Sequence, residues 1–207
     1  MAATGASQKA GWLSEVRAQA VAVDSAISEA VEKTETPALD RFLVLLSDAA
    51  NGSRLWIATA AAVALVGGPR GRRAATEAVA SIALASAVSN LALKSMSRRR
   101  RPQAGKGQVV PSRQVRRPMS SSFPSGHAAS AFAFASTMGE MLPVTWVPTH
   151  LAASLVAYAR VHTGVHYPSD VVAGALAGAM CGSVVRRLAR RLSPRTQRAG
   201  ESHVVRR

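Results

Sequence analysis

Apolar residues recur at helical spacing near the start of the chain. They follow one another at alternating intervals of three and four residues: Leu13, Val16, Ala20, Val23, Ile27 and Ala30. Such spacing gives a helix one apolar stripe and leaves its other faces polar. The pattern predicts a disordered tail over residues 1–10 and an amphipathic helix over residues 11–36, which Pro37 ends. This helix can lie on a membrane surface or, more commonly, against the protein's own core.

Longer apolar segments fill most of the remaining chain. After a short apolar segment that begins at Leu39, five alanine-rich stretches cover residues 55–68, 74–93, 127–142, 144–159 and 171–185. Because alanine dominates and aromatic residues make up only 4% of the chain, these stretches favour closely packed helices over sheets. The pattern predicts an all-α bundle of five to six apolar helices over residues 39–190, followed by a basic disordered tail over residues 191–207.

The lengths of these helices do not by themselves place them in a membrane. Most fall short of the ~20 residues that span a bilayer core, and Glu77, Glu140 and His150 interrupt them. Two other features favour transmembrane helices. Arginine clusters lie immediately beyond the apolar ends, and small residues recur on one face of the last helix at positions 174, 178 and 182, where they permit close helix contact. We therefore expect an integral membrane protein.

The charge balance indicates an anionic partner. The chain carries 26 lysines and arginines against 11 acidic residues, which gives a net charge of +15. Such an excess suits nucleic acid, a membrane surface or a phosphorylated substrate, and the charge alone does not choose among them. No nucleic-acid-binding module is recognisable. The single Cys181 excludes an internal disulfide framework, and the first residues do not resemble a cleavable signal peptide.

Carboxylates are scarce in the part of the chain that holds most of the arginines and histidines. Between Ala78 and Gly200 the only acidic residues are Glu140 and Asp170. A metal-dependent phosphatase or nuclease needs several carboxylates or histidines that converge on its ions. The sequence therefore predicts no metal and no other cofactor, and any phosphate chemistry must be carried out by arginine, lysine and histidine.

Three segments deliver polar side chains to one end of the predicted bundle. These side chains follow one helix, begin the next, and lie between the last two: Lys94 and Arg101, then Ser125, Gly126 and His127, then Arg160, His166 and Asp170. Arginine binds two phosphate oxygens at once and lysine adds a compact charge, while a Ser-Gly pair at a helix start offers a hydroxyl and backbone N–H groups. We expect Lys94, Arg101, Ser125, Gly126 and Arg160 to bind a phosphate dianion.

Two histidines in unlike surroundings suit covalent phosphoryl transfer. One neutral imidazole would attack phosphorus, and one protonated imidazole would protonate the leaving oxygen. A carboxylate at Asp170 would fix the tautomer of His166 and stabilise the cation that forms on attack. This spacing favours His166 as the nucleophile and His127 as the general acid.

The same three segments resemble the signature of the type 2 phosphatidic acid phosphatase superfamily, which also contains bacterial acid phosphatases and vanadium-dependent haloperoxidases. The matching runs are KSMSRRRRP from Lys94, PSGH from Pro124 and ARVHTGVHYPSD from Ala159. The resemblance implies phosphate binding by Lys94, Arg101, Ser125, Gly126 and Arg160, and catalysis by His127, His166 and Asp170. The third run usually begins with serine, and Ala159 stands in its place here, which removes one supporting hydroxyl.

The resemblance implies a metal-independent phosphatase of the plasma membrane that acts on a lipid phosphate or diphosphate. Arginines near residues 70–73 and after Val185 share the end opposite the predicted site, so the positive-inside rule favours an active site that faces outward. Two alternatives remain open: a vanadium-dependent haloperoxidase, and a non-enzymatic basic protein that binds a membrane surface or nucleic acid. The oligomeric state and the lipid tail of the substrate are not indicated by the sequence.

Other basic residues near the signature carry a simpler interpretation. Residues 98–100 are expected to form a solvated charge run, and Arg113, Arg116 and Arg117 a plain basic loop. His162 lies inside the third run but outside its matched positions, so we expect a structural role. His150 is expected to be a helix-end or core histidine.

Overall fold

The fold is built only from helices in the part of the chain that can be described. A computed structural model describes residues 2–34, 36–94, 97, 99–102, 111–115 and 119–192. The α-helices are α1 (Ala2–Glu32), α2 (Pro37–Ala49), α3 (Arg54–Val66), α4 (Gly68–Ala87), α6 (Gly126–Met141), α7 (Trp146–His162) and α8 (Pro168–Leu192). Short 3-10 turns cover Asn51–Ser53, Pro111–Arg113 and Pro143–Thr145, and a π-helical turn, Val88–Leu93, continues α4. The predicted all-α class is confirmed.

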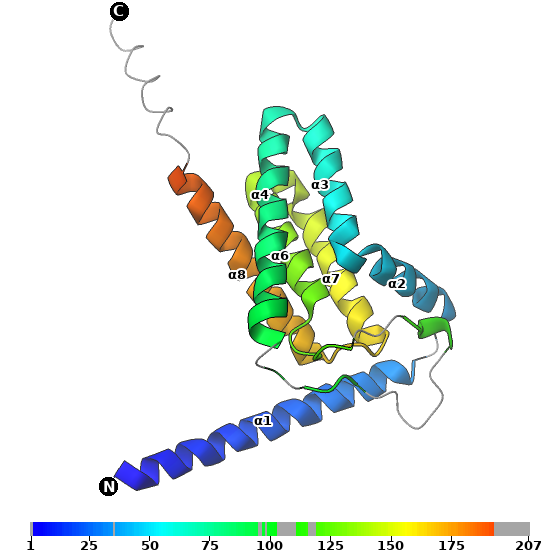
Figure 1. Ribbon diagram of the computed structural model, residues 1–207. Coiled ribbons are helices and arrows are strands. Elements are labelled where there is room, and N and C mark those ends of the chain that lie inside the picture. The colour runs from blue at the N-terminus through cyan, green and yellow to red at the C-terminus, as the bar shows by residue number, and fades with distance from the viewer. Residues whose placement is uncertain are drawn as a thin grey trace, which may run out of the picture.

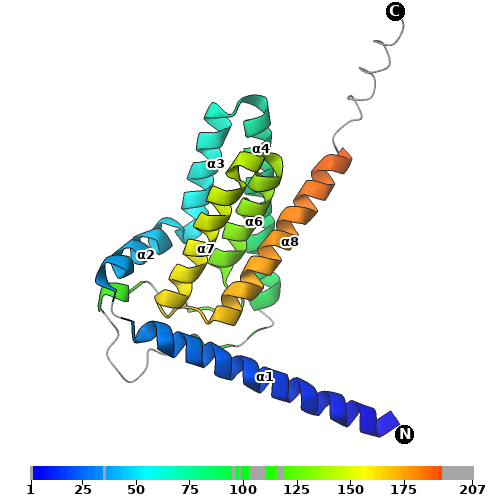
Figure 2. The ribbon, with the colours of Figure 1, turned by 180° about the vertical axis from the view of Figure 1, so that it is seen from behind.

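Helix α6 lies at the centre of the bundle and packs against α4, α7 and α8, as Figures 1 and 2 show from opposite sides. Alanines make up much of its buried surface, which lets the neighbouring helices approach closely. Phe134 fills the core between α6 and α3, with its ring centroid 5.3 Å from that of Trp56. The buried helix α6 thus holds its first turn, and with it His127, at one fixed end of the bundle.

The small residues predicted on one face of α8 pack directly on α6. A Cβ atom at Gly174 would collide with the carbonyl oxygen of Ser125, and one at Gly178 with the carbonyl oxygen of Ala129. At Gly182 the added atom would lie 2.9 Å from the side chain of Thr137. The stripe therefore sets the distance between α6 and α8, the two helices whose first turns carry His127 and Asp170.

We expect Gly178→Ala to destabilise the protein by ~1–3 kcal/mol, because the added methyl group meets backbone that cannot move without shifting a whole helix. Thermal unfolding in detergent measures the effect. Leu176→Ala on the exposed side of the same helix is the matched control and should change the melting temperature much less. Equal melting temperatures for Gly178→Ala and the unmodified protein would contradict the close packing described for these helices.

Fewer helices than predicted are candidates for crossing a membrane. Among the described residues, only Gly68–Leu91 and Pro168–Leu192 are long and apolar enough, and the bent pair α2 and α3 could form a third span. The expectation of five to six transmembrane helices is therefore wrong. The reason is length, since α6 has 16 residues and α7 has 17, against the ~20 that a bilayer core requires. The chain is nevertheless a membrane protein with candidate transmembrane helices.

Helix α1 crosses one end of the bundle and extends well beyond it toward the N-terminus (Figures 1 and 2). Its predicted apolar stripe is largely exposed, with Val16 at 43% and Val23 at 57%, so the stripe does not pack on the protein's own core. The backbone of α1 begins at Ala2, within the stretch for which the sequence predicts a tail. Alanine is the best helix former and recurs in this stretch, which favours the longer helix.

The acidic residues that interrupt the apolar helices are paired with arginines of α8. Glu77 of α4 is almost fully buried and accepts a 2.5 Å hydrogen bond from Arg186. Glu140 at the end of α6 pairs with Arg190 and lies 3.6 Å from Arg186. These pairs lie toward the end of the bundle opposite α1, where α4 begins and α8 ends (Figure 1). The basic clusters of α4 and α8 therefore share that end, as the sequence predicts.

Candidate active site

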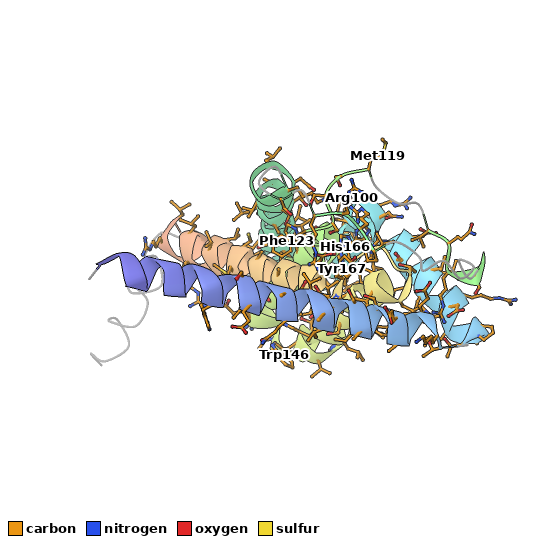
Figure 3. The ribbon with its side chains drawn as sticks, turned by 90° about the horizontal axis from the view of Figure 1, so that it is seen from below. Arg100, Met119, Phe123, Trp146, His166 and Tyr167 are labelled. Atoms are coloured by element: carbon orange, nitrogen blue, oxygen red, sulfur yellow. The ribbon has the colours of Figure 1, made fainter. Side chains whose placement is uncertain are left out.

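The two signature histidines lie at the end of the bundle that α1 crosses. His127 is in the first turn of α6, and His166 lies in the short connection between α7 and α8. Ser125 caps α6, and its backbone N–H donates a 2.9 Å hydrogen bond to the carbonyl oxygen of Asp170. That bond ties the start of α6 to the start of α8. Figure 3 views this end from below and labels His166 and Tyr167 there.

His166 is buried between a carboxylate and a guanidinium. Its Nδ1 lies 3.6 Å from Oδ2 of Asp170, which is too long for a hydrogen bond but favours an Nδ1 proton. Its Nε2 lies 3.2 Å from an N–H group of Arg101, so Nε2 presents its lone pair. Burial and the charges of Arg160 and Arg101 lower the pKa of His166 to about 4, against the opposing effect of Asp170. The ring is therefore neutral at neutral pH, which is the form of an imidazole that can act as a nucleophile.

Asp170 is fully buried in the first turn of α8 and both of its oxygens are occupied. Oδ2 accepts a 2.9 Å hydrogen bond from the backbone N–H of Tyr167 and faces His166. Oδ1 accepts a 2.9 Å hydrogen bond from Arg99. The carboxylate is held in one orientation from two sides, which suits a residue that orients an imidazole.

Three cations from separate elements lie close to the histidines. Nζ of Lys94 donates to Asn90 at 2.8 Å, and a Cβ atom added to Gly126 would lie 3.8 Å from that Nζ. Burial, together with the charges of Arg101 and Arg160, lowers the pKa of Lys94. Mutual repulsion among these cations would be relieved by an anion placed between them. The predicted phosphate-binding residues are therefore brought together.

Arg160 is the largest of the fully buried side chains, with an exposed fraction of 1%. One N–H group donates to the hydroxyl of Ser47 at 2.5 Å. Among the described residues its Nε has no hydrogen-bond partner. Burying a guanidinium with an unsatisfied N–H donor costs free energy unless a ligand accepts a hydrogen bond from that donor. A phosphate oxygen at this position would accept it.

A hydrogen-bond chain holds His127 from the bend between α2 and α3. Asn51 donates from its amide nitrogen to Asp48 at 3.2 Å, which turns its amide oxygen toward His127. That oxygen lies 2.9 Å from Nε2 of His127, so Nε2 carries a proton. Asn51 could not be identified from the sequence, because it precedes the signature and stands in an Asn-Gly turn, which needs no functional explanation.

Two expectations about basic residues are corrected. Arg99, expected in a solvated run, joins Asp170 to Asp24 of α1. Arg113, expected in a plain basic loop, is buried and donates to Asp40 of α2 at 2.9 Å. Each arginine pairs with a carboxylate that lies more than 70 residues away along the chain. Arg116, Arg117 and Arg98 lie outside the described residues.

Two further histidines of the described residues, His162 and His150, make contacts that fit the structural roles expected of them. His162 is buried and its Nε2 lies 2.7 Å from Oδ1 of Asp40, in the same cluster as Arg113. His150 stacks on Trp146, with ring centroids 4.5 Å apart, and bonds to the backbone of α7. No group of three or more histidine, cysteine, aspartate or glutamate side chains that could hold a metal ion occurs within the described part of the chain.

Comparison with known proteins decides the family. The model of the PAP2 superfamily matches residues 74–194, which is more than half of the chain. The chain belongs to the PAP2 superfamily. The match contains every residue of the signature from Lys94 to Asp170, but it excludes α1, α2 and α3. Asp24 of α1 and Asn51 of the turn between α2 and α3, which both contact the site, therefore lie outside the residues that the family model matches.

Individual PAP2 relatives are similar over the bundle. Decaprenylphosphoryl-5-phosphoribose phosphatase of Mycobacterium tuberculosis is 40% identical over 124 residues, which are 58% of this chain and 62% of the relative. The chain thus matches less than two thirds of that protein's length. LpxE of Aquifex aeolicus superposes with a TM-score of 0.63 at 26% identity, over 78% of this chain and 93% of that one.

A second solved PAP2 structure has the same fold. It is the phosphatidylglycerolphosphate phosphatase of Bacillus subtilis, described as a transmembrane protein of the PAP2 type. It superposes with a TM-score of 0.60 at 21% identity, over 84% of this chain and 87% of that one. At this identity the likeness concerns the arrangement of the helices, which extends to elements outside the matched residues 74–194.

Proposed function

We propose that this protein is a metal-independent membrane phosphatase that removes phosphate from a lipid phosphate or diphosphate through a phosphohistidine intermediate. The observation that carries the proposal is the setting of His166. Its Nε2 lone pair is directed toward the guanidinium of Arg101, and its Nδ1 faces Asp170. A neutral imidazole beside three cations has both the nucleophile and the charge that phosphoryl transfer requires.

In the first step, Lys94, Arg101, Arg160 and the N-terminus of α6 bind the phosphate oxygens. Nε2 of His166 forms a bond to phosphorus while the bond from phosphorus to the lipid oxygen breaks. In the absence of substrate, an N–H group of Arg101 donates a hydrogen bond to Nε2. When substrate is bound, the same N–H group donates to a phosphate oxygen instead. The Nδ1 proton then lies on a cationic phosphoimidazole, which the carboxylate of Asp170 stabilises.

His127 supplies the proton that the leaving oxygen needs. The negative charge of the bound phosphate offsets the surrounding cations and thereby favours the protonated imidazole at this position. Asn51 accepts from Nε2 and stabilises the same cation. In the second step the neutral His127 accepts a proton from water, the water oxygen attacks phosphorus, and the bond to His166 breaks to release inorganic phosphate.

The proposed substrate class follows from the helices and from the relatives. The candidate membrane spans support a site at the end of a membrane-embedded bundle, where the headgroup of a lipid would reach it. The M. tuberculosis relative is named for a decaprenylphosphoryl sugar phosphate, which supports a polyprenyl-linked phosphate among the candidates. The arginines of α4 and α8 at the opposite end support an active site that faces away from the cytoplasm.

Phosphate release from a panel of lipid phosphates by the detergent-solubilised protein tests this function. We expect release to continue in excess EDTA, because arginine, lysine and histidine replace metal ions at the site. A bromide-oxidation assay with vanadate and peroxide is the control for a haloperoxidase, and should be negative. Loss of phosphate release in EDTA that magnesium restores would contradict the proposed mechanism.

A further inference from the structure

Asp24 is a buried acidic residue of α1 that contacts the start of α8. Only 3% of the residue is exposed, although the apolar stripe of the same helix faces outward. Its Oδ1 accepts a 2.9 Å hydrogen bond from the backbone N–H of Ser169. Its Oδ2 accepts 2.5 Å hydrogen bonds from the hydroxyl of Ser169 and from Arg99. Asp24 thus sits at the N-terminus of α8, next to Asp170, where a carboxylate is favoured.

Arg99 joins this carboxylate to the one that faces His166. Its Nη1 donates to Oδ1 of Asp170 at 2.9 Å and to the hydroxyl of Ser169 at 2.7 Å, while Nη2 donates to Asp24. The guanidinium also lies 4.3 Å from the ring centroid of Tyr167. One planar cation is therefore shared between an acid of α1 and an acid of the site.

The protonation of these groups follows from the sharing. Burial alone would raise the pKa of Asp24, but the hydrogen bonds from Ser169 and Arg99 lower it. Burial alone would lower the pKa of Arg99, but the two carboxylates raise it. Asp24 and Arg99 therefore both stay charged at neutral pH. Arg99 partly neutralises Asp170, and Asp24 in turn draws part of that positive charge toward α1.

We propose that α1 is a working part of the active site, in which Asp24 and Arg99 are positioning residues that set how strongly Asp170 attracts the proton of His166. This inference rests on the proposed role of His166 as nucleophile. The guanidinium holds Asp170 in place and limits its negative charge, so that His166 stays neutral until it attacks. Asp24 prevents the guanidinium from neutralising Asp170 completely, so that the cation formed on attack is still stabilised.

Other charged and titratable groups that act on His166 come from four separate elements. Asp170 belongs to α8 and Arg160 to α7, while Arg101 comes from the connection after α4 and His127 from α6. The test leaves all four unchanged. Substitutions at Asp24 and Arg99 therefore report on the link to α1 without removing any group that would touch the phosphate.

The test is an NMR titration of the ¹⁵N-labelled imidazole of His166 in the detergent-solubilised protein, with the signal assigned by its loss in His166→Gln. Arg99→Gln removes the cation and should raise the pKa of His166 by about one pH unit. Asp24→Asn removes the second carboxylate, so that Arg99 pairs with Asp170 alone, and this substitution should lower the pKa of His166. Opposite shifts from two substitutions in one ion pair are a result that a merely structural role does not produce.

Matched substitutions control for the general change in charge. Arg100→Gln removes an exposed arginine next to Arg99, and Glu29→Gln removes an exposed acid from α1. Both should leave the pKa of His166 unchanged, and Arg99→Lys, which keeps the cation, should restore most of the native value. A far-ultraviolet circular dichroism spectrum equal to that of the unmodified protein establishes that each variant is folded.

An unchanged pKa in folded Arg99→Gln, or a raised pKa in Asp24→Asn, would overturn the proposal. The titration reads the proton on His166 directly and needs no turnover. A protein that releases no phosphate from any lipid phosphate would therefore refute the proposed function while still showing whether α1 controls His166. The acid limb of kcat/KM for an aryl phosphate should move in the same direction as the titration in each variant.

Discussion

His166→Ala should abolish turnover, with a loss of at least about 10⁴-fold in kcat on every substrate. The reason is geometric. At His166 the lone pair of Nε2 faces the guanidinium of Arg101, whereas at His127 the Nε2 atom carries a proton and donates to Asn51. Without a nucleophile the first step cannot occur. Steady-state phosphate release measures the loss.

His150→Ala is the matched control for that substitution. His150 lies in α7 and stacks on Trp146, and it should keep nearly full activity. Asp170→Asn should fall between the two, because the nucleophile remains while its cationic form loses a carboxylate. Turnover by folded His166→Ala at a tenth or more of the native rate would exclude His166 as the nucleophile.

His127→Ala should lower kcat by ~10²- to 10⁴-fold on a lipid phosphate, whose alkoxide is a poor leaving group. An aryl phosphate, such as p-nitrophenyl phosphate, has a leaving group that hardly needs a proton and should be affected much less. The ratio of the two losses therefore measures general acid catalysis. It separates this role from a contribution to phosphate binding, which would affect both substrates alike.

The comparison of the two substrates also tests the assignment of the histidines to their roles. If His127→Ala loses the aryl substrate as completely as His166→Ala does, the general acid assignment is wrong. The hydrogen bond from His127 to Asn51 provides an internal check, since Asn51→Ala should reduce activity on the lipid phosphate more than on the aryl phosphate. Both effects have one physical origin, the proton delivered to the leaving oxygen.

Much of the site could be predicted from the order of helices and polar residues. Helices of similar length that alternate in direction bring the residues after Leu93, before His127 and after Tyr158 to the same end of a bundle. The structure places Lys94 beside Gly126 and His166 beside Asp170 accordingly. Local spacing sufficed because each of the three segments is continuous and lies at a helix end.

Contacts from the first three helices could not be predicted in this way. Arg99 stands in a run of four arginines, and nothing in the run shows which one meets a carboxylate. Asp24 is one of several acids on an amphipathic helix, and its burial depends on how that helix crosses the bundle. Asn51 reaches His127 because of a bend between α2 and α3. These pairings depend on tertiary arrangement, which neither periodicity nor spacing encodes.

The number of membrane spans was overestimated for a related reason. Apolar composition identified the helices, but burial inside a protein and burial in lipid both favour apolar residues. Helix α6 is apolar chiefly because α4, α7 and α8 surround it. Exposed apolar side chains on α8, such as Leu176 and Met180, are the better indication of lipid contact, and they become visible only when the packing is known.

The central claim is that phosphate is transferred to Nε2 of His166, and the most direct test is to trap that intermediate. The protein is mixed with a radiolabelled lipid phosphate, quenched with alkali within milliseconds, digested and sequenced by mass spectrometry. The account predicts an acid-labile, alkali-stable phosphate on His166 that forms before free phosphate appears, is bonded to Nε2, and is absent in His166→Ala. Phosphate on another residue, or covalent phosphate that persists in His166→Ala, would contradict it.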